Sequence, residues 1–438
     1  MKSTTSAITL TSIWLAAQTS AFSLSEAGDE STGPSAENLA DYEICENTGD
    51  QDCNYAYLKE NLPEGKKSWI VAPDSNTVCL DGSPFGFLVF PGTTDRVMLW
   101  FQGGGACYDY ETCVAAPTAL TRFSPNSEGY FNYDLEGNPL ASGGWTSIVN
   151  NCCSGDMFIG DATRELTNGT HTETVHFAGY NNTLAVLNWM QAQSEFPVDQ
   201  EIASGGCSAG SLGVQVWADY LVRNYGVDKL QPDSYIGMLP REAGDTMLQW
   251  NACGPAKAQY LEQDIVDLCE AGGLHEMPPV FNDFLAKNPE FPVAYTGSAH
   301  DIVQRGYYAL LTSQIYTCGV MEYLPGFAEV SLTFSDYLWT ALTGYNEADV
   351  NYSYYIVDTT QHSFVVKDDI VSNEAVNSPY SDLTMWEYVG KFLNEDEYQN
   401  SPSYPAELPP TLALDIDPTK FYDYIKQHQT VHYQEQDA

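Results

Sequence analysis

The sequence feature that most limits the possible folds is the pentapeptide Gly-Cys-Ser-Ala-Gly at residues 206–210, which has the pattern Gly-x-Ser-x-Gly. A strand signal at 201–205 precedes it, and apolar residues at helical spacing follow it at 214–221. A strand-to-helix turn of this kind is so sharp that its serine takes a strained backbone conformation, and small flanking residues relieve the crowding. The pattern indicates that Ser208 is a nucleophile; the alternative is a glycine-rich turn that only begins the helix.

The rest of the chain alternates between strand and helix signals. Short β-rich apolar runs bounded by Gly or Pro occur at 85–90, 97–101, 235–239, 291–296 and 352–357. Helical spacing occurs at 181–193 as well as at 214–221. This alternation predicts an α/β fold with a mostly parallel central sheet flanked by helices. We expect one α/β-hydrolase-like catalytic domain over residues 67–395.

The two ends of the chain differ from this domain in composition. Residues 1–21 combine Lys2, a short apolar stretch and a small-residue end, which predicts a secretory signal peptide and an extracellular location. Residues 22–66 are acidic, and we expect a poorly ordered leader that Cys45 and Cys53 could pin. Whether this leader is a propeptide stays open. Residues 396–438 form a Pro-rich segment and a polar tail, with a last helix expected at 421–428.

Charge limits the partners. The chain has 59 acidic and 17 basic residues, a formal net charge of -42. Such a surface repels phosphate backbones, so we expect no nucleic-acid partner, and it suits solubility in a saline extracellular medium. No segment is apolar for long enough to predict a membrane span. We expect a monomer.

Cysteines and sequons fit export. Eleven cysteines in an exported chain predict disulfides, with at least one thiol left free. Candidate N-glycosylation sites occur at Asn168, Asn181 and Asn351.

A serine nucleophile needs a base and an acid. In the α/β-hydrolase order the acid and then the histidine follow the serine, which leaves His362, just past the strand signal at 352–357, as the best base. Asp301 follows the strand signal at 291–296 and is the preferred acid. The competing carboxylates are Asp245, Asp264 and Asp358. The first two follow no clear strand, and the third shares the loop of His362. We interpret His300 as an ordinary loop residue.

The segment Gln-Gly-Gly-Gly-Ala at 102–106 follows the strand signal at 97–101. It matches the glycine-rich loop that supplies oxyanion donors in many esterases. A phosphate-binding loop is the alternative, but its terminal Gly-Lys-Ser/Thr is missing.

These motifs together resemble the pectin acetylesterase family, which includes the related carboxylesterase Notum. The resemblance is carried by Thr-Val-Cys-Leu-Asp-Gly-Ser-Pro at 77–84, Phe-Gln-Gly-Gly-Gly-Ala-Cys at 101–107, Cys-Ser-Gly-Asp at 153–156 and the pentapeptide at 206–210. It spans about 69–364. The chain departs from the family at Ala106, where Trp is frequent, and at Ser211, where Gly is frequent, so the contacts around the acyl group are expected to differ.

The resemblance implies roles for individual residues. It implies a triad of Ser208, Asp301 and His362, and oxyanion donation by the amides of Gly104, Gly105 and Ala209. It also implies two disulfides, Cys79–Cys153 and Cys107–Cys113.

The expected activity is two-step acyl transfer without a metal or other cofactor. By resemblance, the substrate is an O-acetyl group on a cell-wall polysaccharide such as acetylated pectin, and the expected location is the cell wall. Two alternatives stay open: removal of a fatty-acyl group, as in a Notum-like carboxylesterase, and glycan binding without catalysis on a hydrolase scaffold. A thiol nucleophile at Cys207 is a minor alternative, because adjacent side chains on a sharp turn point in opposite directions and Cys207 is expected to face the core.

Overall fold

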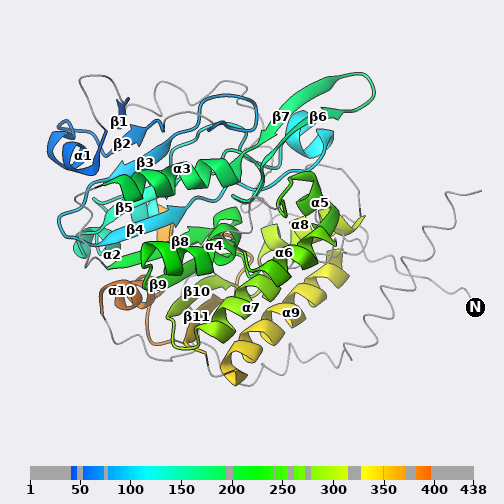
Figure 1. The fold of residues 1–438 in the computed structure, drawn as a ribbon. Coiled ribbons are helices and arrows are strands. Elements are labelled where there is room, and N and C mark those ends of the chain that lie inside the picture. The colour runs from blue at the N-terminus through cyan, green and yellow to red at the C-terminus, as the bar shows by residue number, and fades with distance from the viewer. Residues whose placement is uncertain are drawn as a thin grey trace, which may run out of the picture.

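The computed structural model describes residues 41–46, 53–73, 77–193, 201–237, 239, 243–254, 261–271, 278–313, 327–348, 350–370, 378 and 381–395. A nine-stranded sheet forms the centre of the described part (Figure 1), in the order β1-β2-β3-β5-β4-β8-β9-β10-β11. The strands are β1 (Tyr42–Cys45), β2 (Ser68–Val71), β3 (Phe87–Phe90), β4 (Val97–Phe101), β5 (Thr146–Asn150), β8 (Ile202–Cys207), β9 (Lys229–Asp233), β10 (Val293–Ser298) and β11 (Tyr352–Val357).

Pairing within this sheet is parallel except where β3 lies antiparallel to β2 and to β5. The predicted mostly parallel α/β architecture is therefore confirmed. The run at 97–101 is β4 and the run at 352–357 is β11, with the limits that the sequence predicts.

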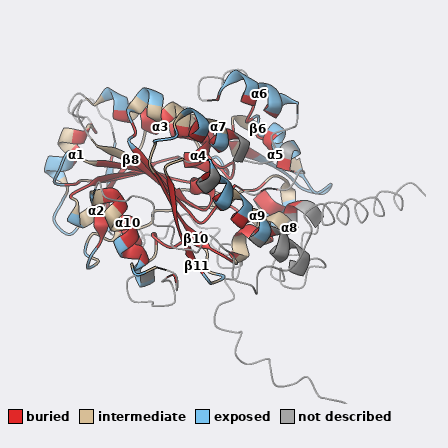
Figure 2. Ribbon diagram, turned by 90° about the horizontal axis from the view of Figure 1, so that it is seen from below, coloured by how far each residue is buried: buried red, intermediate tan, exposed pale blue. Residues whose placement is uncertain are grey.

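Helices cover both faces of the sheet. The helices are α1 (Tyr55–Asn61), α2 (Pro139–Ser142), α3 (Gly179–Ala192), α4 (Ala209–Tyr225), α5 (Ala243–Gln249), α6 (Gln263–Glu270), α7 (Pro278–Lys287), α8 (Ile302–Ser313), α9 (Phe327–Glu347) and α10 (Met385–Asn394). Short π or 3-10 turns occupy Glu111–Ala115, Gly129–Phe131 and Asp368–Ile370. In Figure 2 the buried strands form a layer between α3, α4 and α7 on one side and α2 and α10 on the other.

The alternation of side chains along β4 divides the core in two. Leu99 and its same-face neighbours pack in a cluster with residues of α3 and α4, whereas Met98 and Trp100 pack with residues of α2 and α10. Period-two alternation is the geometry of a strand, and here both faces are apolar because both are covered. The sheet is thus fixed from two sides, which gives its carboxyl end a rigid frame for functional loops.

A two-stranded hairpin lies outside this sheet. Its strands β6 (Ala162–Thr167) and β7 (Thr172–Phe177) are antiparallel and extend beyond the sheet near α5 in Figure 1. Asn168 lies in the exposed turn between them.

Two expectations drawn from the sequence need correction. The expected strand at 235–239 is wrong, because 235–237 and 239 are in a loop and the strand lies earlier, at Lys229–Asp233. The polar residues Lys229, Gln231 and Asp233 of this strand are buried, and Lys229, for example, contacts Glu201 at 2.5 Å.

The expectation of poor order over 22–66 is wrong for 41–46 and 53–66, because β1 forms the edge of the sheet and α1 follows it; the other residues of this range lie outside the described ones. The disulfide Cys45–Cys53 joins the two elements. The last helix expected at 421–428 lies outside the described residues. Among the helices of the described ranges, none has the length and apolarity that crossing a membrane requires.

Candidate active site

Ser208 lies at the turn between β8 and α4, with φ 56° and ψ -123°. A positive φ is unfavourable for any residue with a Cβ, so this is the strained turn that the pentapeptide predicts. The flanking glycines are sterically required: a Cβ at Gly206 would overlap the backbone of Gly210, and a Cβ at Gly210 would overlap the carbonyl of Phe101. The Ser208 side chain is held at the end of the sheet, and the residue is 9% exposed.

Asp301 and His362 are brought together by the register of two neighbouring strands. The pairing of β10 with β11 ends at Ser298 and Val357. The pairing continues into the loops that follow the two strands. The amide of His300 donates to the carbonyl of Thr359 at 3.2 Å, and the amide of Ile302 donates to the carbonyl of Thr360 at 3.1 Å. Because the segments after β10 and β11 run side by side past the end of the sheet, the loop after β11 places His362 next to Asp301.

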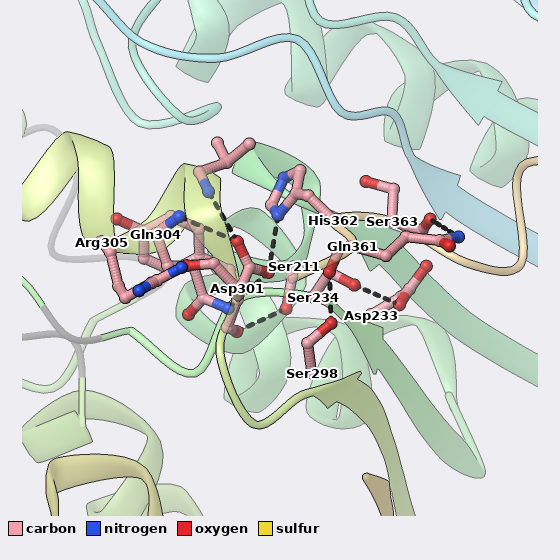
Figure 3. A network of polar contacts seen from close by, with 12 residues as sticks. Ser211, Asp233, Ser234, Ser298, Asp301, Gln304, Arg305, Gln361, His362 and Ser363 are labelled. Carbon is pink, nitrogen blue, oxygen red and sulfur yellow. Dashed lines mark hydrogen bonds and ion pairs between the residues drawn. The ribbon is translucent and has the colours of Figure 1, made fainter. Parts of the chain in front are cut away.

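The Asp301 carboxylate is fully buried and accepts several hydrogen bonds (Figure 3). Its Oδ1 accepts from the amides of Val303 and Gln304, both at 2.9 Å, in the first turn of α8. Its Oδ2 accepts from Gln304 Nε2 at 2.9 Å and lies 2.8 Å from His362 Nδ1. An ionised carboxylate only accepts, so Nδ1 carries the proton and Nε2 is left as the basic nitrogen.

His362 Nε2 is buried and has no hydrogen-bond partner among the described residues. It therefore makes no hydrogen bond to Ser208 in this conformation, and such bonds are often long before substrate binds. A buried, unpaired acceptor in a polar network is a group that is available for proton transfer.

The competing acids do not contact His362. Asp358 contacts His300 Nε2 at 3.2 Å, and this pair is partly exposed. Asp245 lies on α5 and Asp264 on α6, and both are exposed.

The glycine-rich loop passes beside the nucleophile. A Cβ at Gly103 would lie 3.2 Å from the Cβ of Ser208 and 2.9 Å from Cys207 Sγ. A Cβ at Gly104 would lie 2.9 Å from Cys152 Sγ. The loop can therefore approach Ser208 this closely only without side chains.

The end of the same loop is held by Tyr307 of α8. The amide of Ala106 donates to Tyr307 Oη at 3.3 Å, and the hydroxyl donates to the carbonyl of Thr118. The Ala106 amide is therefore already occupied.

Both free cysteines among the described residues, Cys152 and Cys207, are buried. Burial, reinforced by the charge of Asp233, raises the pKa of the Cys207 thiol to about 12. Such a thiol stays protonated near neutral pH, which argues against a thiol nucleophile here.

An apolar pocket opens next to Ser208. It encloses about 480 Å³, including its opening to solvent. Gly105, Ser208 and Ala209 are among the residues that line it. The rest of the lining is mostly apolar and is formed by Met157, Leu212, Leu239, Ala243, Met247, Trp250 and Leu311, among others. An acyl group bound to Ser208 could extend into this space.

The structure pairs Cys79 with Cys153 and Cys107 with Cys113. It also pairs Cys253 with Cys269. The Cys107–Cys113 bond closes the segment directly after the glycine-rich loop, and the carbonyl of Cys107 accepts a hydrogen bond from Trp250 of the pocket wall at 2.9 Å. The remaining cysteine, Cys318, lies outside the described residues.

The three sequons differ in their surroundings. Asn168 is exposed, whereas the side-chain amide of Asn181 donates to Asp161 at 2.8 Å and that of Asn351 donates to the carbonyl of Glu290 at 3.2 Å. Glycosylation remains a prediction, and it is most accessible at Asn168.

Sequence reasoning missed Gln304, Tyr307 and Trp250. The first two follow Asp301 at intervals of three residues, and this spacing is a helical signal that could have placed them on one face of α8. Nothing in the sequence near Trp250 indicates its contact with the distant Cys107.

Comparison with known proteins agrees with the motifs. A family model described as Pectinacetylesterase matches residues 58–230. The resemblance to the pectin acetylesterases is confirmed. The matched segment includes the glycine-rich loop and Ser208, whereas Asp301 and His362 lie beyond it. No curated protein shows significant sequence similarity to the chain.

Solved structures with a similar fold include the Wnt deacylase Notum from Drosophila in two crystal forms. Crystal form I has 15% sequence identity and a TM-score of 0.48, and crystal form II has 14% and 0.49. Both alignments cover 74% of this chain and 92% of Notum.

Proposed function

We propose that the protein is a secreted serine ester hydrolase that uses Ser208, His362 and Asp301. One observation carries the proposal: a buried Asp301–His362 pair with an unpaired Nε2 lies at the same end of the sheet as a serine with strained backbone, beside an apolar pocket. The match to the pectinacetylesterase family supports ester hydrolysis. Four disulfides among the described residues support an extracellular location.

In the first half of the proposed reaction, His362 Nε2 takes the proton of Ser208 while Oγ attacks the ester carbonyl carbon. The amides of Gly104, Gly105 and Ala209 donate to the oxyanion, and each such donor contributes about 3 kcal/mol in well-studied enzymes. His362 then returns the proton to the oxygen of the departing alcohol, and the acyl group stays on Ser208 as an ester.

In the second half, water attacks the acyl-enzyme and His362 accepts its proton. Collapse of the second oxyanion returns the proton to Ser208 Oγ and releases a carboxylic acid. Asp301 orients the imidazole throughout and stabilises its protonated form.

Replacement of the nucleophile tests this function. Ser208→Ala should lower the rate of p-nitrophenyl acetate hydrolysis at least a thousandfold, because the reaction loses its covalent step. Cys207→Ala is the matched control and should keep most of the activity. A fluorophosphonate probe should label the parent protein at Ser208, as read by peptide mass spectrometry. Activity retained in Ser208→Ala would contradict the proposal, and a parent protein without hydrolysis or labelling would favour the glycan-binding alternative.

The natural acyl group has two candidates. The family match favours an O-acetyl group on a polysaccharide. The pocket favours a longer acyl chain, because most of its lining is apolar and each buried methylene contributes about 0.8 kcal/mol.

A pocket-filling variant separates the two. If acyl chains enter the pocket, Ala243→Phe should lower kcat/KM for p-nitrophenyl octanoate at least tenfold and leave that for the acetate within about twofold. The acetate serves as the control for folding. In the parent protein, a kcat/KM that rises about fourfold per methylene from acetate to hexanoate supports the longer substrate, whereas a maximum at acetate supports the deacetylase.

A further inference from the structure

Asp233 is a buried carboxylate that the proposed triad does not use. It ends β9, the strand between β8, which leads to Ser208, and β10, which leads to Asp301. Its side chain is 0% exposed. A fully buried carboxylate is costly unless its oxygens are hydrogen-bonded, so its partners indicate its role.

Four groups donate to Asp233, two to each oxygen. Ser234 Oγ at 2.7 Å and Thr296 Oγ1 at 2.9 Å donate to Oδ1. The amides of Phe364 at 2.9 Å and Val365 at 3.2 Å donate to Oδ2. Burial raises the pKa of Asp233, and these hydrogen bonds oppose the rise. Both amides can only donate, so Oδ2 acts as an acceptor toward the loop.

The two amides belong to the chain directly after the base. Between them and His362 lies Ser363, whose φ of 62° is unfavourable for a residue with a Cβ. A strained segment keeps its conformation only where its surroundings determine it. Here Asp233 Oδ2 holds the next two residues, while Lys367 Nζ donates to the carbonyl of His362 at 3.0 Å.

The backbone of Asp233 reaches the nucleophile. Its carbonyl accepts the amide hydrogen of Ser208 at 2.9 Å. One residue therefore holds the nucleophile turn with its main chain and the histidine loop with its side chain.

We propose that Asp233 is a positioning residue for hydrolysis, which fixes His362 relative to Ser208 by hydrogen-bonding the loop at Phe364 and Val365. This proposal rests on the proposed function. A displacement of about 1 Å between reacting groups can cost about a hundredfold in rate, so loss of the loop's anchor should act on the chemical step.

Asp233→Ala and Asp233→Asn test the proposal, with Ser234→Ala as the matched control. Asp233→Ala should lower kcat at least tenfold and leave KM within about twofold, because the acyl pocket is unchanged. Asp233→Asn should lower kcat less than Asp233→Ala does. The side-chain carbonyl oxygen of this variant can still accept from both amides, and its NH2 group can face the two hydroxyls. Ser234→Ala removes one donor to Oδ1 and should keep kcat within about twofold.

A second readout does not depend on catalysis. Diethyl pyrocarbonate modifies histidine nitrogens, and the buried Nε2 of His362 should react slowly in the parent protein and in Ser234→Ala. Peptide mass spectrometry should show modification of His362 at least fivefold faster in Asp233→Ala. If the parent neither hydrolyses esters nor labels at Ser208, the proposed function fails, and this reaction still reports whether Asp233 holds the loop.

The proposal is overturned if Asp233→Ala keeps the parent's kcat and the parent's rate of His362 modification. It is also overturned if Asp233→Asn lowers kcat as much as Asp233→Ala does. The fall in kcat would then come from the lost negative charge and not from the loss of the loop's hydrogen bonds. Thermal unfolding checks that each variant folds. Should Asp233→Ala not fold, Asp233→Val, which also has no acceptor for the two amides, takes its place: a lower kcat with faster modification of His362 supports the proposal, and parental values reject it.

Discussion

The hydroxyl of Tyr307 connects the candidate oxyanion loop to the helix that begins beside Asp301. It accepts from the amide of Ala106 and donates to the carbonyl of Thr118. A Cβ at Gly105 would lie 2.6 Å from this hydroxyl, so the tyrosine also occupies the space that a side chain there would need. The loop is thus held by this hydroxyl together with the hydrogen bonds from the Leu120 amide to the carbonyl of Gly104 and from Thr118 Oγ1 to the carbonyl of Ala106, both at 2.7 Å.

Tyr307→Phe removes that atom and keeps the ring that lines the pocket. We expect kcat to fall about three- to tenfold with KM within about twofold, because the oxyanion is stabilised more strongly in the transition state than the substrate is in the ground state. Steady-state kinetics on p-nitrophenyl acetate measure both constants. Tyr308→Phe removes a hydroxyl from the next residue of the same helix and serves as the control. An unchanged kcat in Tyr307→Phe would mean that the loop holds its position without the hydroxyl.

The residues that can be recognised from the sequence differ from those that cannot in how far apart in the chain their contacts lie. Ser208 and its flanking glycines are recognisable because the steric requirement of the turn lies within five consecutive residues. Asp301 and His362 are recognisable because each follows a strand signal in the expected order. Tyr307 and Asp233 carry no comparable local signal, since their roles come from contacts with Ala106 and Phe364, far away in the chain.

The same contrast holds for whole elements. Runs of apolar residues predict β4 and β11, because a strand that is buried on both faces has apolar side chains along nearly its whole length. β9 is missed because Lys229, Gln231 and Asp233 are polar although all are buried. Their partners lie on other elements, such as Glu201 for Lys229 and Thr296 for both Gln231 and Asp233. Periodicity cannot reveal a strand whose buried polar side chains contact residues far away in the chain.

α10 is an element whose start can be tested by pH. Thr384 and Glu387 form a capping box: the amide of Thr384 donates to Glu387 Oε2 at 2.8 Å, and the amide of Glu387 donates to Thr384 Oγ1 at 3.1 Å. The amide and then the hydroxyl of Thr384 lower the pKa of Glu387. A lowered folded-state pKa means that the contribution is fully present above the ordinary glutamate pKa of about 4.3 and is lost as the pH falls through the folded-state value.

Glu387→Ala should therefore lower the free energy of unfolding by about 0.5 kcal/mol at pH 7, a modest value because the carboxylate is exposed and water screens it. The difference from the parent should shrink as the pH falls through the lowered pKa of Glu387, because protonation of the carboxyl removes the interaction. Urea unfolding with the disulfides intact measures both values. Glu387→Gln keeps a capping-box side chain without a titrating group, so its difference from Glu387→Ala should not change with pH. A difference between parent and Glu387→Ala that grows on acidification would refute this account.

At the scale of the whole molecule, charge is the dominant property. With 59 acidic and 17 basic residues, the net charge of -42 creates a negative potential that extends about one Debye length from the surface, about 10 Å at 0.1 M salt. This potential acts on an approaching substrate before any contact forms. It therefore affects kcat/KM for charged esters and leaves that for neutral esters nearly unchanged.

The charge of the substrate should thus decide how the enzyme responds to salt. For the p-nitrophenyl monoester of succinic acid, whose second carboxyl is ionised, kcat/KM should rise severalfold between about 10 and 300 mM NaCl, because screening weakens the repulsion. A neutral butyrate ester of similar size should change little, and an ester that carries a trimethylammonium group should lose rate over the same range. Initial rates at substrate concentrations far below KM give all three values. An equal response of the three esters would mean that the global charge does not reach the site. A fall for the succinate ester would mean that a local positive region outweighs the net charge, and de-esterified, polyanionic glycans would then become suitable substrates.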